Sequence, residues 1–240
     1  MPGVVEWLWK EGKGLRPRTD KNRHGPTRAS PKGRKEHTMR TNTNTNTDRI
    51  FAATAKAQRA ATRANNAEHE ATTAADLALS GMGVVADIAH WENATEGAKA
   101  IARTSWEKYV ADQSNKARAA AEKAWRASHT AARAAQEAAK MALAIATDPT
   151  TTTEEAEKAA EMACEAQESA NSAWEDAHAA EGYANQAEGK QDPWGEANAR
   201  ADAEAEADDA AGCGADAWET TMARANGQIS AKAARQTMGR

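Results

Sequence analysis

Large apolar side chains are scarce in this 240-residue sequence, which has one Phe, two Tyr and few Leu, Ile or Val. A typical globular domain draws most of its buried surface from these residues. No segment approaches the roughly 20 apolar residues that a transmembrane helix needs. The short apolar stretch at residues 4–9 precedes the basic residues, whereas in a signal peptide it follows them. We therefore predict a cytoplasmic protein without membrane contact.

Cysteine is almost absent as well. Cys164 and Cys213 lie far apart in the sequence, in neither a zinc-site spacing nor a disulfide framework. We expect both to be reduced thiols of the buried kind. Cys164 lies in an Ala- and Glu-rich segment, where a raised thiol pKa makes it unreactive. The sequence also lacks a Gly-x-Ser-x-Gly motif and a glycine-rich phosphate loop, so we predict no catalytic residues and no cofactor.

Charge is distributed unevenly along the chain. Residues 1–47 contain eleven Lys or Arg and four Asp or Glu, whereas the remainder is acidic. This composition, without any apolar periodicity, predicts a disordered, low-complexity segment over residues 1–47. The segment is also the only part of the chain that we expect to attract nucleic acid.

A second hypothesis concerns residues 1–38, which could be untranslated upstream sequence. Lys35-Glu36 can be encoded by AAGGAG, a bacterial ribosome-binding sequence, and two further codons separate it from Met39. That spacing would allow translation to start at Met39. The intact mass of the natively expressed protein distinguishes this hypothesis from a translated basic arm.

Alanine, in contrast, makes up about a quarter of the sequence and recurs at helical spacing. Small residues follow one another at alternating steps of four and three, which is a heptad pattern. We therefore predict an all-α fold over residues 48–240, a long antiparallel, alanine-seamed, coiled-coil-like bundle of four to five helices. The two clearest seams are Ala53, Ala57, Ala60, Ala64, Ala67, Ala71, Ala74 and Ala78, and Ala156, Ala159, Ala163, Ala166, Ala170, Ala173, Ala177, Ala180, Ala184 and Ala187.

Capping residues and helix breakers predict where these helices begin and end. We expect a first helix from Asp48 to near Ser80, with a hinge or reversal at residues 81–83. A second stretch should run from Val84 to Ala146, with an interruption around residues 93–97.

Two more helices are expected after Pro149. One follows a capping box at residues 151–155 and ends near Gly189. The other begins at Asp192-Pro193, continues to Met238 and is kinked by glycines at residues 212–214.

Tryptophan forms an internal repeat. Trp125, Trp174 and Trp218 each follow a seam alanine directly, and His129, His178 and Met222 come four residues later. Our first interpretation is that each Trp widens the apolar stripe and that the residue one turn later packs on its ring. The alternative is that the Trp faces form a partner groove or a ligand site.

A ferritin-like dimetal site is a further possibility. Such bundles use Glu-x-x-His pairs on two helices, and the sequence offers Glu175-x-x-His178 and, more loosely, Asp87-x-x-His90. Both Glu175 and His178 lie beside the alanine seam rather than on it, which favours a solvated surface.

The function that these features favour is a non-enzymatic helical interaction or scaffolding protein. It would bind a protein partner or associate with itself through its helix faces and tryptophans. Two alternatives remain open, namely the dimetal protein and a nucleic-acid-associated protein acting through the basic amino-terminal segment. Metal content and salt-dependent nucleic-acid binding, respectively, would distinguish them.

Overall fold

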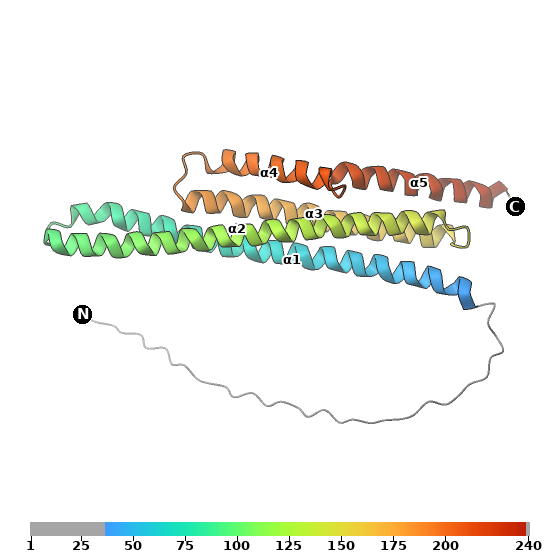
Figure 1. Cartoon of the computed structure of the whole chain (residues 1–240), viewed down its shortest axis with the longest axis horizontal. Helices are drawn as coiled ribbons and strands as arrows, with labels where there is room; N and C mark the ends of the chain where they lie inside the picture. The colour runs from blue at the N-terminus through green and yellow to red at the C-terminus, as the bar shows by residue number, and fades with distance from the viewer. Residues whose placement is uncertain (1–36, 239–240) are drawn as a thin grey trace, which may run out of the picture. The chain divides into compact units, whose positions relative to one another are not determined.

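A computed structural model describes residues 37–238, where five α-helices and one 3-10 turn are present and no strand occurs (Figure 1). The predicted all-α fold is therefore confirmed. Residues 1–36, on which the hypotheses about translation and nucleic-acid binding mainly rest, lie outside the described residues. The expected disorder of residues 1–47 is wrong for residues 37–47, which form the start of α1. The elements are α1 (His37–Asp87), η1 (Ile88–His90), α2 (Glu96–Thr147), α3 (Thr153–Ala187), α4 (Pro193–Ala210) and α5 (Ala215–Met238).

The first three helices pack against one another in all three pairwise combinations, and we call them the trunk. They alternate in direction, because short connections return the chain after each helix (Figure 1). Helix α4 packs mainly on α3, and α5 packs mainly on α2. None of the described helices is long and apolar enough to cross a membrane.

The predicted alanine seams are the interior of the trunk. All eight seam alanines of α1 and all ten of α3 are buried. The alanine seam of α2 is buried as well over Ala117 to Ile145, at positions Ala117, Ala121, Ala124, Ser128, Ala131, Ala135, Ala138, Ala142 and Ile145. Each methyl group removes little apolar surface from water, but small side chains let helix backbones approach closely and gain dispersion contacts.

The predicted caps of α3 and α4 are confirmed. Thr152 accepts a hydrogen bond from the Glu155 amide, and the Glu155 carboxylate accepts one from the Thr152 amide, forming a capping box. Asp192 caps α4 by accepting a hydrogen bond from the Gly195 amide, with Pro193 at the first helical position.

The expected boundaries of the first helix were wrong at both ends. α1 begins at His37 rather than Asp48, since extending an existing helix adds one hydrogen bond for each residue fixed. It also continues through Gly81 to Asp87, so residues 81–83 form no hinge. The absence of a side chain at Gly81 instead lets α1 pack closely on α2, because a Cβ atom there would lie 2.7 Å from the Val110 side chain.

Two further boundaries also differ from the expectation. The interruption expected around residues 93–97 is present, since α2 begins at Glu96 after an N-cap at Thr95, but the break is longer and the chain reverses over residues 88–95. The expected last helix is divided into α4 and α5. Gly212 has a φ of 68°, a left-handed conformation that ends α4 rather than kinking it.

Candidate functional site

Two of the three predicted tryptophans meet in space. Trp125 on α2 is only 2% exposed, and the edge of one ring faces the other at 6.5 Å between the centroids of Trp125 and Trp174. Each ring also contacts the histidine one turn later. The centroids are 6.4 Å apart for Trp125 and His129, and 5.7 Å apart, in a stacked geometry, for Trp174 and His178. These four residues form what we call the Trp–His cradle.

The third copy of the repeat lies elsewhere. Trp218 on α5 is partly buried and packs against the core that contains Met222, which is itself buried. The interpretation that the repeat widens an apolar stripe therefore fits all three copies. Ring packing by the residue one turn later is confirmed for the two histidine copies.

The cradle is occupied by α4. Arg200 places its guanidinium 5.5 Å from the Trp125 ring centroid, a cation–π geometry. His178 lies 6.2 Å from the Trp194 ring and within 2.8 Å of the Asn198 side-chain oxygen. The repeat that the sequence displays is thus a binding surface for a helix of the same chain.

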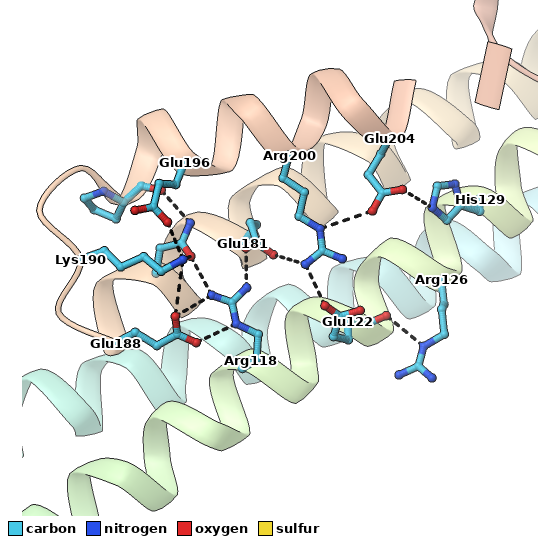
Figure 2. A network of polar contacts seen from close by, with 12 residues as sticks. Arg118, Glu122, Arg126, His129, Glu181, Glu188, Lys190, Glu196, Arg200 and Glu204 are labelled. Atoms are coloured by element: carbon cyan, nitrogen blue, oxygen red, sulfur yellow. Dashed lines mark hydrogen bonds and ion pairs between the residues drawn. The ribbon is translucent and has the colours of Figure 1, made fainter. Parts of the chain in front are cut away.

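Arg200 is the centre of a network of ion pairs that joins α4 to α2 and α3 (Figure 2). One of its nitrogens lies 2.8 Å from the Glu122 carboxylate of α2 and 2.9 Å from the Glu181 carboxylate of α3. A second nitrogen lies 3.4 Å from Glu204 on α4 itself. Burial alone would lower the Arg200 pKa, but its pairs with Glu122 and Glu181 outweigh burial and raise it.

Glu181 is the most deeply buried member, at 4% exposure. It pairs with Arg118 of α2 as well as with Arg200, so two cations compensate one buried carboxylate. Arg118 also donates two hydrogen bonds to Glu188, at 2.7 and 2.9 Å. The hydrogen bonds from Arg118 hold the Glu188 pKa below its usual value, and a hydrogen bond from Arg200 does the same for Glu122.

His129 connects α2 to the other end of α4. Its Nδ1 lies 3.0 and 3.1 Å from the two Asp208 oxygens, and its Nε2 lies 3.1 Å from Glu204 (Figure 2 shows the Glu204 contact). A ring whose two nitrogens both face carboxylates donates two hydrogen bonds when it is the cation. The hydrogen bond to Asp208 raises the His129 pKa, although burial opposes it.

Sequence reasoning missed two residues that shape this site. A Cβ atom on Gly182 would clash with the Trp194 ring, so the glycine provides the space in which that ring lies on α3. Asn185 is fully buried, donates to the Pro193 carbonyl at 2.9 Å and accepts from Arg118 at 2.7 Å. A glycine and an asparagine within an otherwise alanine-rich helix were the available signal.

The residues proposed for a dimetal site are not brought together as a ligand set. No group of three His, Cys, Asp or Glu in residues 37–238 could hold a metal ion. Asp87 ends α1, His90 lies in η1, and Glu175 is exposed on α3. His178 instead stacks on Trp174 and contacts Asn198.

The two cysteines differ from each other. Cys213 is buried as predicted, whereas Cys164 is exposed, because it faces away from the seam that Ala163 occupies. Partial burial, together with neighbouring carboxylates, raises the pKa of both thiols, so the expected unreactive character of Cys164 is supported.

No family model matches the chain, and the comparisons with curated proteins and with solved structures find no match either.

Proposed function

We propose that this protein is a non-enzymatic helical interaction or scaffolding module that acts with a protein partner or a second copy of itself. The observation that carries the proposal is the part of the α1–α2 hairpin at residues 77–112, which we call the arm. Ser114 Oγ donates to the carbonyl of Ala187, the last residue of α3, at 2.5 Å. Most of the arm therefore lies past the end of α3 (Figure 1).

The arm exposes more large apolar side chains than the rest of the trunk does. Of the eight exposed large hydrophobic residues in the described structure, four belong to it, namely Leu77, Leu79, Trp91 and Ile101. Ile101 is 72% exposed and Trp91 is 40% exposed. Exposed apolar residues gathered in one region favour a protein contact more than residues scattered singly do.

The polar side chains around the cradle also support an interaction or scaffolding role. The two histidines of the cradle and the nearby carboxylates of Glu122 and Glu181 are engaged by α4 through hydrogen bonds and ion pairs. The cradle binds a helix of the same chain, whereas the exposed apolar residues of the arm are free to pack against a helix of a partner.

Light scattering of the full-length chain across a concentration series tests the proposal. We expect a dimer or larger assembly that the double substitution Trp91→Ser with Ile101→Ser converts to a monomer. Phe51→Ser, which changes a side chain that is 67% exposed on α1 outside the arm, is the matched control and should leave the mass unchanged. A wild-type chain that is monomeric at every concentration would contradict self-association.

A further inference from the structure

Helix α4 buries little apolar surface for its length. Of its residues Pro193–Ala210, only Ala197 and Ala201 are buried. The helix carries six Asp or Glu and one Arg, so it is strongly acidic. Without compensating cations such as His129 of α2 and Lys190 of the α3–α4 connection, these carboxylates would repel one another and gain little from docking.

The carboxyl-terminal half of α4 is attached to α2 through one titratable group. His129 contacts both Glu204 and Asp208, which lie one turn apart on α4. The α4 backbone packs mainly on α3, so the connection to α2 depends on side chains such as His129. Loss of one proton from His129 would therefore weaken two contacts at once.

Other charged groups around His129 do not replace it. On α4, Arg200 is already shared among Glu204, Glu122 of α2 and Glu181 of α3. On α2, Arg133 interacts with the Cys213 thiol, which itself lies beside Asp208. From α3, the uncharged Trp174 packs on Trp125, whose ring in turn contacts His129.

Packing beneath this end of α4 is also incomplete. A cavity of about 220 Å³ lies between α2, α3 and the α4–α5 connection, and its lining includes Trp174, Asp208 and Cys213. Close packing, which would hold the helix irrespective of charge, is therefore reduced beside Asp208, one of the two residues that His129 contacts.

We propose that the carboxyl-terminal half of α4 is a pH-sensitive cover of the Trp–His cradle, held closed by protonated His129 and released when His129 becomes neutral. Release would increase the exposure of both rings, of which Trp125 is 2% exposed and Trp174 is 36% exposed in the closed arrangement. The inference concerns contacts within one chain and does not depend on the proposed scaffolding function.

The direction of the pH effect follows from the linkage between docking and protonation. Docking raises the His129 pKa above its ordinary value of 6.5, mainly through the hydrogen bond to Asp208. The stabilisation by His129 is thus complete below pH 6.5 and is lost as the pH rises through the raised value. The Cys213 thiol, whose pKa is raised by burial, stays protonated across this range.

Hydrogen exchange of the full-length chain at about pH 6 and about pH 8.5, corrected for intrinsic exchange rates, tests the proposal. We expect the protection of α4 amides to fall with rising pH, by about tenfold for each pH unit by which docking raises the His129 pKa. Amides of α3 provide the internal control and should keep their protection. Unchanged protection in α4, or an equal fall in α3, would overturn the proposal.

Three variants test whether His129 is the group responsible for the pH dependence of α4 protection. His129→Gln should leave α4 weakly protected at both pH values, whereas His129→Lys, which keeps a positive charge, should remove the pH dependence and retain protection. His178→Gln changes the other cradle histidine, which contacts Asn198 rather than a carboxylate, and should keep the wild-type pH dependence. A His129→Gln chain that retains this dependence would show that another group titrates.

Discussion

The trunk and helix α4 belong to one chain but are held in place by different forces. In the trunk, alanine methyl groups fill the space between three helices, and nearly every seam position is buried. Helix α4 buries only two of its own residues, both alanines, and its remaining contacts are ion pairs, histidine hydrogen bonds and ring contacts. Shape complementarity between methyl groups is insensitive to pH and salt, whereas contacts between partly exposed charges respond to both.

This difference explains where the large side chains lie. An alanine seam brings helix backbones together, but it contributes little hydrophobic free energy per residue. Trp125 and Trp174 lie outside the seams of α2 and α3, where a fourth helix can cover them. The two tryptophans therefore lie outside the alanine-filled interior of the trunk, and α4 packs against them.

The largest expected effect comes from placing a charge in the trunk. Ala135 of α2 is fully buried, so Ala135→Asp would bury a carboxylate without a partner and should lower the free energy of unfolding by about 3 kcal/mol or more. Denaturant unfolding followed by circular dichroism measures the loss. Ala111→Asp, at an exposed position of the same helix, should change it by less than about 0.5 kcal/mol. Similar losses in both variants would contradict a close-packed seam.

A smaller effect is expected for the charge network. Glu181→Gln removes the buried carboxylate that Arg118 and Arg200 share and should cost about 1–3 kcal/mol, the range for hydrogen bonds to charged groups. Hydrogen exchange should locate the loss mainly in α4. Glu175→Gln, at an exposed site on the same helix, is the control. A loss spread evenly over the trunk would mean that the network holds all the helices together.

The smallest effect concerns the connection after α4. Gly212 has a φ of 68°, so Gly212→Ala should destabilise the protein by about 1–2 kcal/mol at most. Gly227 lies exposed within α5 with open space around its Cα, so Gly227→Ala should instead stabilise it by about 0.5–1 kcal/mol. Thermal unfolding should show shifts of opposite sign. Shifts of the same sign would contradict the left-handed turn at Gly212.

Much of the trunk could be predicted from the sequence because its rules are local. The ten alanines of α3 follow a strict heptad, and the capping box at Thr152 and Glu155 needs only residues three apart. Gly81 was misinterpreted because its importance depends on Val110 of another helix. A glycine looks the same in the sequence whether it breaks a helix or admits a neighbour.

Only part of the candidate site could be predicted from the sequence, for a similar reason. The repeat at Trp125 and Trp174 can be read from the sequence, but its occupant is α4, whose alternation of Ala with polar residues gives no amphipathic stripe. The contacts of His129 with Glu204 and Asp208 join residues 75 and 79 positions apart. No local pattern marks such pairs, so the charge network emerged only from the three-dimensional arrangement.

The most direct test of the different forces is native-state hydrogen exchange of the full-length chain at about pH 6, compared at low salt and at about 1 M salt. At the higher concentration the screening length falls to about 3 Å, which weakens partly exposed ion pairs. The account predicts that α4 amides lose protection as salt increases while trunk amides keep theirs. Equal responses in α4 and the trunk, or no response in α4, would contradict it.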